Sequence, residues 1–232
     1  PVIRIGSKCP LSMAVSILGG LLIVGCAAPI IVPKVADKPP LEIEARGEAK
    51  PIHFRKIVLK IGRGEKVGAE ETGPFCLPTG ELRFRRGRIM LTSRELTKVF
   101  RDELQAAGFE LVNHPNLLFK DPMTWKAELF FAGMVKRMKA NICFPWAVYG
   151  DYGQSKGEAF MEVEWWVYSR SNRQAVHKLT TRGYARHDSI ESNGHLEIFL
   201  DAFAQAIRGM LADQGLGDLV TGTSADGTAA DK

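Results

Sequence analysis

The sequence predicts an α+β fold, with a mainly antiparallel sheet and two helices packed on one of its faces. Three observations lead to this class. Residues 92–107 and 196–211 carry apolar residues at helical spacing. Residues 129–144 and 159–168 read as long strands, and a turn leads from them to a further strand at 175–186. This order of elements is typical of helices that cover one face of an antiparallel sheet.

The chain divides into four parts. We expect a signal peptide at 1–25, a lipidated cysteine with a Pro-rich tether at 26–52, one folded domain at 53–214 and a disordered tail at 215–232. The tether alternates Lys and Glu between prolines, so it cannot bury enough apolar surface to fold. It is expected to hold the domain several nanometres from a bilayer. The tail is rich in Gly, Thr, Ala and Asp.

The composition is that of a globular protein, with 45% hydrophobic and 25% charged residues among 232. This length suffices for one domain with a proper core and is short for two. The formal net charge of +5 falls to +3 once Arg4 and Lys8 leave with the signal peptide. Such a small excess argues against a nucleic-acid partner.

The first elements are short. A strand is expected at 57–61, where β-branched and aliphatic residues follow one another. Gly and Pro punctuate the residues that come next, so segments 75–77 and 82–84 are expected to be short strands or anchored loops.

The first helix begins after Thr92, which forms a capping box with Glu95 three residues later. Its apolar face consists of Leu96, Val99, Phe100, Leu104 and Ala107. Gly108 supplies the C-terminal stop, and a strand is expected directly afterwards at 109–112.

Residues of the strand 159–168 alternate between two faces. One face is apolar throughout, with Met161, Val163, Trp165 and Val167. The other is mixed, with Phe160, Glu162, Glu164, Trp166 and Tyr168. We expect the apolar face to pack on the helices and the mixed face to be wet.

The second helix closes the domain. Its apolar residues recur at intervals of three and four and are Leu196, Phe199, Leu200, Phe203, Ile207, Met210 and Leu211. Gly215 is expected to end it.

The N-terminal segment has the pattern of a bacterial export signal. Two cations, Arg4 and Lys8, precede an uncharged apolar run from Leu11 to Val24, which is of signal-peptide length. A single transmembrane helix is an alternative, because the uncharged run continues past Cys26. Against it, two adjacent glycines and a later proline punctuate the run. An ordinary cleaved signal is the other alternative.

The residues Ile23-Val24-Gly25-Cys26 resemble the bacterial lipobox, in which small or aliphatic residues precede an obligatory cysteine. The resemblance implies cleavage after Gly25 and acylation of Cys26, which anchors the chain to a membrane through its N-terminal lipid. Ala27, rather than Asp, follows the cysteine. In the resembling lipoproteins this implies sorting to the outer membrane, with the domain on its periplasmic face.

The exit of the first helix, Ala106-Ala107-Gly108-Phe109-Glu110-Leu111-Val112, resembles the corresponding exit in a group of envelope lipoprotein domains. This group includes auxiliary lipoproteins of transport systems and curli-type secretion lipoproteins. The resemblance covers residues 53–212 as topology and the helix exit as sequence. It implies an assembly or scaffold role without catalysis.

Two of the four cysteines are available to the folded domain. Cys9 lies in the removed segment and Cys26 would carry lipid, which leaves Cys76 and Cys143. In an oxidising periplasm we expect these two to form a disulfide, the alternative being two buried free thiols. The cysteines and histidines do not have metal-ligand spacing, so no metal site is expected.

One motif matches a nucleophile elbow. Residues 153–157 read Gly-Gln-Ser-Lys-Gly, and an elbow would place Ser155 where a strand turns into a helix. The following residues alternate like a strand, so we expect a hairpin loop here. His177, or His187 with Asp188, would have to complete a triad. We therefore expect no catalytic residue and no enzyme activity.

Other motifs are equally weak. The glycines at 62–68 follow a strand, but their spacing and the next Gly-Pro pair exclude a dinucleotide loop, so no cofactor is expected. Glu162 and Glu164 share one strand face, as general acid–base pairs do. A solvated sheet face is the favoured interpretation of these two glutamates.

A dense positive cluster surrounds Phe84 and consists of Arg83, Arg85, Arg86 and Arg88. Guanidinium groups suit phosphates and carboxylates. The candidate ligands in an envelope are lipid headgroups, lipopolysaccharide and acidic partner surfaces. The alternative is an exposed hairpin that charge keeps soluble.

These features predict a non-catalytic interaction or assembly subunit of an envelope transport, secretion or surface-structure complex. Its partner would be another envelope protein or further copies of itself. A lipid anchor raises local concentration, so modest contacts suffice. The alternative is a carrier or chaperone for lipids or other amphiphiles, which would need a cavity lined by residues such as Phe100, Trp165 and Phe203.

Overall fold

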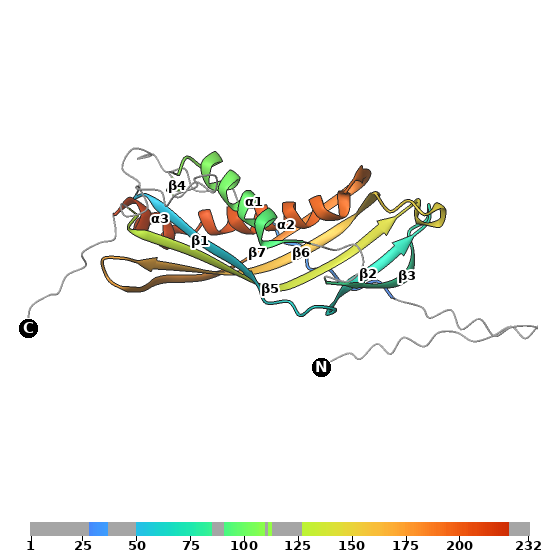
Figure 1. The fold of residues 1–232 in the computed structure, drawn as a ribbon, viewed down its shortest axis with the longest axis horizontal. Coiled ribbons are helices and arrows are strands. Elements are labelled where there is room, and N and C mark those ends of the chain that lie inside the picture. The colour runs from blue at the N-terminus through green and yellow to red at the C-terminus, as the bar shows by residue number, and fades with distance from the viewer. Residues whose placement is uncertain (1–27, 37–49, 85–90, 110, 113–126, 223–232) are drawn as a thin grey trace, which may run out of the picture.

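A computed structural model describes residues 28–36, 50–84, 91–109, 111–112 and 127–222. The strands are β1 (Ile52–Leu59), β2 (Lys66–Thr72), β3 (Leu77–Arg83), β4 (Leu111–Val112), β5 (Leu129–Phe144), β6 (Gln154–Ser169) and β7 (Gln174–Ser192). The helices are α1 (Ser93–Ala106), α2 (Gly194–Leu211) and α3 (Gln214–Thr221), with a 3₁₀ turn at Ala147–Tyr149. The described strands form one sheet, and α1 and α2 lie together on one of its faces (Figure 1).

The long strand β5 organises the sheet. β6 runs antiparallel along one edge of β5, and β7 runs antiparallel to β6. On the other edge of β5, β1 pairs with residues 129–135 and β2 with residues 140–144, both in parallel. The predicted α+β class with helices on one face is confirmed. The sheet is mixed rather than mainly antiparallel, because the segment containing α1 returns the chain to the start of β5.

The core fills the space between the sheet and the two helices. Trp165 of β6 packs against Phe100 of α1 and Phe203 of α2, with ring centroids 5.6 and 5.8 Å away and the rings tilted. The predicted apolar face of β6 is buried. On the predicted face of α1, Leu96, Phe100 and Leu104 are buried, and Val99 and Ala107 are partly buried. The capping box is present: the Thr92 amide donates to Glu95 over 2.7 Å, and the Glu95 amide donates to Thr92 over 3.3 Å.

The edge strand β7 is covered by α2. A Cβ atom at Gly183 of β7 would come within 1.8 Å of the Ala202 carbonyl oxygen, so glycine is required for this close approach. One step along the strand, the Tyr184 amide donates to the side chain of Gln205 on α2. The helix therefore caps an edge that would otherwise present an unpaired backbone donor.

The predicted disordered tail is wrong for its first part, since Gln214–Thr221 forms α3. Asp213 caps this helix, its carboxylate accepting from the Leu216 amide over 2.9 Å. Leu216 and Val220, one turn apart, are both buried. The expectation that Gly215 ends the second helix is also wrong, because α2 ends at Leu211 and Gly215 lies within α3. Residues 223–232 lie outside the described part.

The predicted free tether is also wrong in part. Residues 28–36, which we call the N-terminal strap, lie against the sheet. The Ile30 amide donates to the Asn141 side chain over 3.1 Å, and the Asn141 side chain donates to the Ile30 carbonyl over 2.8 Å. Val32 is buried. The Asn141 side chain of β5 thus provides hydrogen-bond partners for the backbone of this Pro-rich segment, which forms no regular secondary structure of its own. The signal peptide, Gly25 and Cys26 lie outside the described residues.

Cys76, in the turn between β2 and β3, is joined to Cys143 of β5 by a disulfide bond. This agrees with the pairing expected from the sequence. Glu71 lies close to both sulfur atoms, but the bond consumes the thiolates that a metal ion would need. The disulfide ties the β2–β3 hairpin to the end of the central strand.

Among the described residues, no helix combines the length and the apolar character that crossing a bilayer requires.

Candidate functional site: the outer face of the sheet

The face of the sheet opposite the helices, here called the outer face, carries a set of aligned charged and aromatic side chains. Strand alternation places Glu162, Glu164, Trp166 and Tyr168 of β6 on it. Register then aligns neighbours across the strands: Glu162 pairs with Arg182, and Trp166 lies between Ala132 of β5 and Lys178 of β7. The two predicted faces of β6 are present, but the face expected to be wet is buried at Phe160, Glu162 and Glu164 and exposed only at Trp166 and Tyr168.

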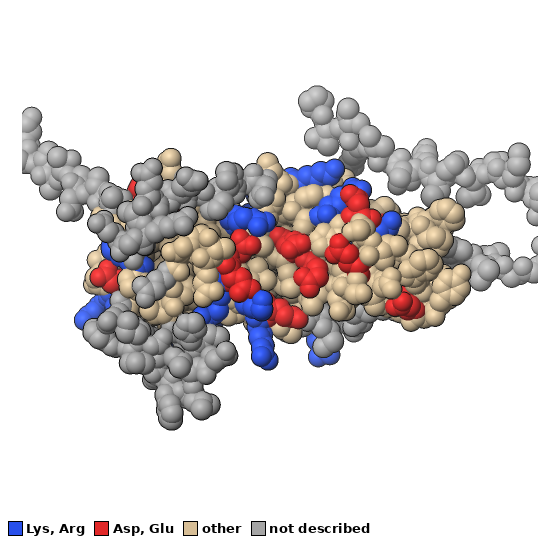
Figure 2. All heavy atoms as spheres, turned by 90° about the horizontal axis from the view of Figure 1, so that it is seen from above, with Lys and Arg blue, Asp and Glu red and all other residues tan. Residues whose placement is uncertain are grey.

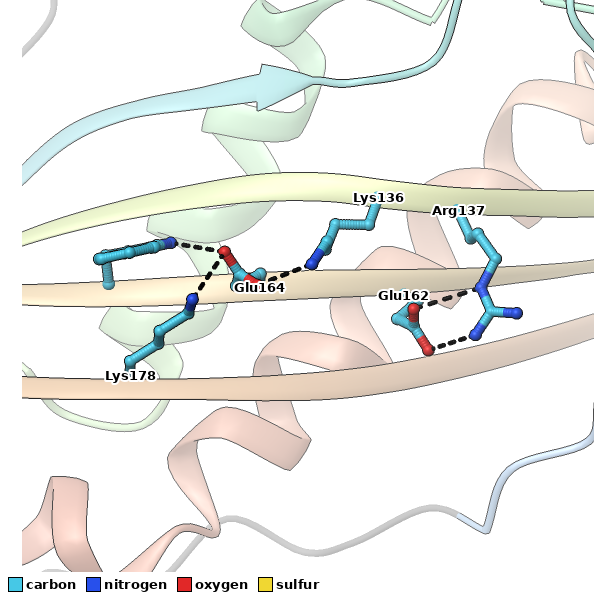
Figure 3. A network of polar contacts seen from close by, with 6 residues as sticks. Lys136, Arg137, Glu162, Glu164 and Lys178 are labelled. Carbon is cyan, nitrogen blue, oxygen red and sulfur yellow. Dashed lines mark hydrogen bonds and ion pairs between the residues drawn. The ribbon is translucent and has the colours of Figure 1, made fainter.

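Two glutamates at its centre are each held by two cations. Figure 3 shows both cations of Glu164 and, for Glu162, Arg137. Glu164 contacts Lys136 at 2.8 Å and Lys178 at 3.4 Å, and it accepts from the Trp166 indole over 2.9 Å. Both glutamates are more than nine-tenths buried. Burial of a carboxylate is tolerated because opposite charges and hydrogen bonds compensate it.

The second glutamate, Glu162, contacts Arg137 at 2.8 Å and Arg182 at 2.9 Å. Hydrogen bonding by Arg137, assisted by Arg182, lowers the pKa of Glu162. Hydrogen bonding by Lys136, with Trp166 and Lys178, lowers the pKa of Glu164 to about 2. Both carboxylates are thus ionised at neutral pH and poorly suited to donate or accept a catalytic proton. The four cations leave this cluster with an excess of positive charge.

Acidification is expected to weaken the fold through Glu164. Its pKa is depressed from 4.5 to about 2, so its stabilising effect is complete above about pH 4.5 and is lost as the pH falls through about 2. The free energies of unfolding of the wild type and Glu164→Gln, measured in urea, should therefore differ most at neutral pH. This difference should become smaller on acidification. A gap that stays constant across this window would contradict the assignment.

An exposed aromatic patch adjoins the charged cluster. It surrounds a shallow pocket of about 370 Å³, and its residues are Arg55, Phe130, Ala132, Trp166, Tyr168 and Arg170. Trp166 and Tyr168 are 39% and 41% exposed. Lys178 sits 4.1 Å from the centre of the Trp166 ring. The surface of this pocket is mainly apolar, and Arg55 and Arg170, which also line it, are exposed.

The helix side of the molecule has the opposite charge. Acidic side chains gather over α1 and α2 (Figure 2). Those lining the groove between the two helices are Glu95, Asp102, Glu103, Glu197 and Asp201. Lys98 is the basic residue of this lining and pairs with Asp102 over 2.7 Å. A partner that matches the outer face therefore does not match the helix side.

The predicted arginine cluster is only partly described. Arg83 contacts Glu81 of its own hairpin and donates to the Gly64 carbonyl over 2.8 Å. Its guanidinium group is thus used within the domain. Arg85, Arg86 and Arg88 lie outside the described residues.

The sequence predicts a hairpin loop for the nucleophile-elbow motif. The structure instead places it at the start of β6. Ser155 has no exposed surface. Its hydroxyl accepts from the His195 amide over 2.6 Å and lies 3.3 Å from the His195 ring. His195, rather than His177 or His187, is therefore its neighbour. Ser155 caps α2, whose N-cap residue Asn193 makes no capping side-chain bond.

Sequence reasoning missed Arg55, Phe130, Arg170 and Lys178 as members of the site. The sequence does carry a signal for the contribution of β7. Lys178, Arg182 and Arg186 are spaced by even numbers of residues, which places them on one face of a strand. The contributions of β1 and β5 carry no such signal, since they depend on which strands become neighbours.

No family model matches this chain, and no curated protein matches it. Among solved structures, protein XCC0632 from Xanthomonas campestris, of family DUF330, is 15% identical over 85% of this chain and 95% of that chain, with a TM-score of 0.41. PelC from Paraburkholderia phytofirmans, solved as a dodecamer, is 12% identical over 78% of this chain and 97% of its own, with a TM-score of 0.40. A minor lipoprotein from Acinetobacter baumannii is 9% identical over 75% of this chain and 94% of its own, with a TM-score of 0.31. Likenesses this distant do not indicate what the present chain binds.

Proposed function

We propose that this chain is a lipid-anchored, non-catalytic interaction subunit at the periplasmic face of the outer membrane. It would serve an envelope transport, secretion or surface-structure complex, with another envelope protein or a second copy of itself as partner. The lipobox at Cys26 supports the anchor. The disulfide between Cys76 and Cys143 fits an oxidising compartment.

The filled core carries the proposal of a surface-binding role. Phe100, Trp165 and Phe203 have no exposed surface, and the Trp165 ring packs against both phenylalanines. These are the residues that an amphiphile carrier would need around an open cavity. The exposed aromatic patch on the outer face, by contrast, has the aromatic and arginine side chains that are enriched at protein interfaces. Binding through this patch is the interaction that the geometry supports best.

Two observations favour binding over catalysis. Ser155 is buried and serves α2 as a cap, so a substrate cannot approach its hydroxyl. Glu162 and Glu164 are each held between two cations, which keeps them ionised rather than available for proton transfer.

The anchor is tested by mass spectrometry of protein purified from bacterial membranes. We expect the wild type to begin at Cys26 and to carry acyl chains, because the thiol is the acceptor. Cys26→Ala should lack the acyl mass and the cleavage after Gly25. An unmodified N-terminus upstream of Cys26 in the wild type would contradict the anchor.

Pull-downs with Trp166→Ala and Tyr168→Ala, compared with the wild type, then test whether the aromatic patch holds the partner.

A further inference from the structure

The most exposed apolar side chains of the described chain gather at one end of the molecule. They are Ile31, Phe75, Leu77, Val148 and Tyr149, with exposed fractions of 87%, 84%, 62%, 64% and 81%. Trp146 adds a further ring, 41% exposed and 6.4 Å from the ring of Tyr149. Monomeric soluble proteins rarely leave so many large apolar side chains together in water.

Three chain segments bring these residues together. Phe75 lies in the turn between β2 and β3, and Leu77 is the first residue of β3. The loop between β5 and β6 carries Trp146, Val148 and Tyr149. Figure 1 shows the ends of these strands at one end of the molecule. The disulfide from Cys76 to Cys143 ties the turn to the loop, and the Gly73 amide donates to the Phe144 carbonyl over 3.3 Å. The strap joins them, since Pro29 lines the same pocket as both cysteines. We call residues 28–32, 73–80 and 144–150 the apolar tip.

The apolar tip has no charged residue. Its segments read Ala-Pro-Ile-Ile-Val, Gly-Pro-Phe-Cys-Leu-Pro-Thr-Gly and Phe-Pro-Trp-Ala-Val-Tyr-Gly. Charged side chains border these segments, since Glu71, Lys156 and Arg186 line the same pocket as Pro29 and the two cysteines. Uncharged segments that display Trp and Tyr have the composition that proteins present to a membrane interface.

The apolar tip also lies where the anchor would leave the domain. Ile30 lies four positions after Cys26, and it is held by both hydrogen bonds to Asn141. Even a fully extended chain spans only about 14 Å over that distance. An acyl chain on Cys26 would therefore hold the apolar tip at the bilayer surface, whatever the length of chain that follows the strap.

We propose that the apolar tip inserts into the lipid interface beside the acyl chains of Cys26, so that the domain stands on the membrane by this end. This rests on the proposed anchor. The occupant is the bilayer itself, because the apolar tip offers no charge to a specific headgroup. The aromatic patch lies near the other end of β5, roughly 45 Å away by strand rise, and remains open to a partner.

The test compares two exposed tyrosines. Tyr149→Cys places a fluorophore on the apolar tip and Tyr168→Cys places it on the aromatic patch, each in the full acylated chain with its disulfide intact. The proteins are reconstituted in phosphatidylcholine vesicles that contain lipids with quenchers on their acyl chains. We expect quenching at position 149 to exceed that at position 168 several-fold. It should also persist at high salt, because insertion is apolar. Equal quenching at both positions would overturn the proposal.

Matched variants separate insertion from anchoring. Phe75→Ser with Val148→Ser should reduce quenching at position 149, because it removes apolar side chains from the apolar tip. Val58→Ser, which removes an exposed apolar group from β1, away from the apolar tip and the aromatic patch, should leave it unchanged. Equal loss in the tip variant and in Val58→Ser would count against insertion. Mass spectrometry of the same samples detects the acyl chains. An acylated protein that shows no quenching at position 149 would contradict the insertion of the apolar tip but not the lipid anchor.

Discussion

Trp165→Ala is expected to lower the free energy of unfolding by about 4 kcal/mol. The indole is fully buried between Phe100 and Phe203. Its nitrogen donates to Thr181 over 2.7 Å, and Thr181 in turn donates to the Ala206 carbonyl over 2.7 Å. Removal would leave a cavity where sheet and helices meet. It would also remove the donor in a hydrogen-bond chain that ties β6 through β7 to α2. Urea denaturation of the purified protein measures the effect.

The adjacent residue provides the control. Trp166 has the same side chain on the opposite face of β6 and is 39% exposed. Trp166→Ala should cost clearly less than Trp165→Ala, about 1–2 kcal/mol, because it leaves no internal cavity and removes one hydrogen bond to Glu164. Comparable losses in the two variants would mean that the core does not lie on the side of β6 described here.

Removing the disulfide by Cys76→Ser with Cys143→Ser is expected to lower the free energy of unfolding by about 4 kcal/mol. The bond closes a loop between residues separated by 67 positions, and cross-linking such a loop restricts the unfolded chain by about that amount. The same substitution frees the β2–β3 hairpin from β5. Equilibrium unfolding in urea, without reductant, gives the difference.

Reduction of the wild type should reproduce this loss, whereas reductant should leave the double variant unchanged. A wild type that is insensitive to reductant, together with a double variant of unaltered stability, would show that the two thiols are not joined in the folded protein.

Local pattern predicted much of the fold. The strand expected at 129–144 is observed with the same limits as β5, and the capping box begins α1 where Thr92 and Glu95 predict it. The alternation along β6 correctly separates the buried Trp165 from the exposed Trp166. These features could be predicted because hydrophobic period and capping chemistry act over a few residues.

The candidate site was predictable only in part. Glu162, Glu164, Trp166 and Tyr168 were placed on one face from the sequence, but their partners on β1, β5 and β7 were not. Equally, no local signal connects Ile30 with Asn141, or Ser155 with His195. Such contacts join residues far apart in the chain and arise once strand order and helix placement are set.

The sequence by itself therefore determined which side of each element faces the core, and the lipobox that motivates the anchor. Tertiary structure alone decided the mixed sheet, the docking of the strap and the gathering of apolar loops at one end. The physical reason is that burial follows the local period of a helix or strand. Neighbours in space, by contrast, follow register and sheet order, which many local patterns fit equally well.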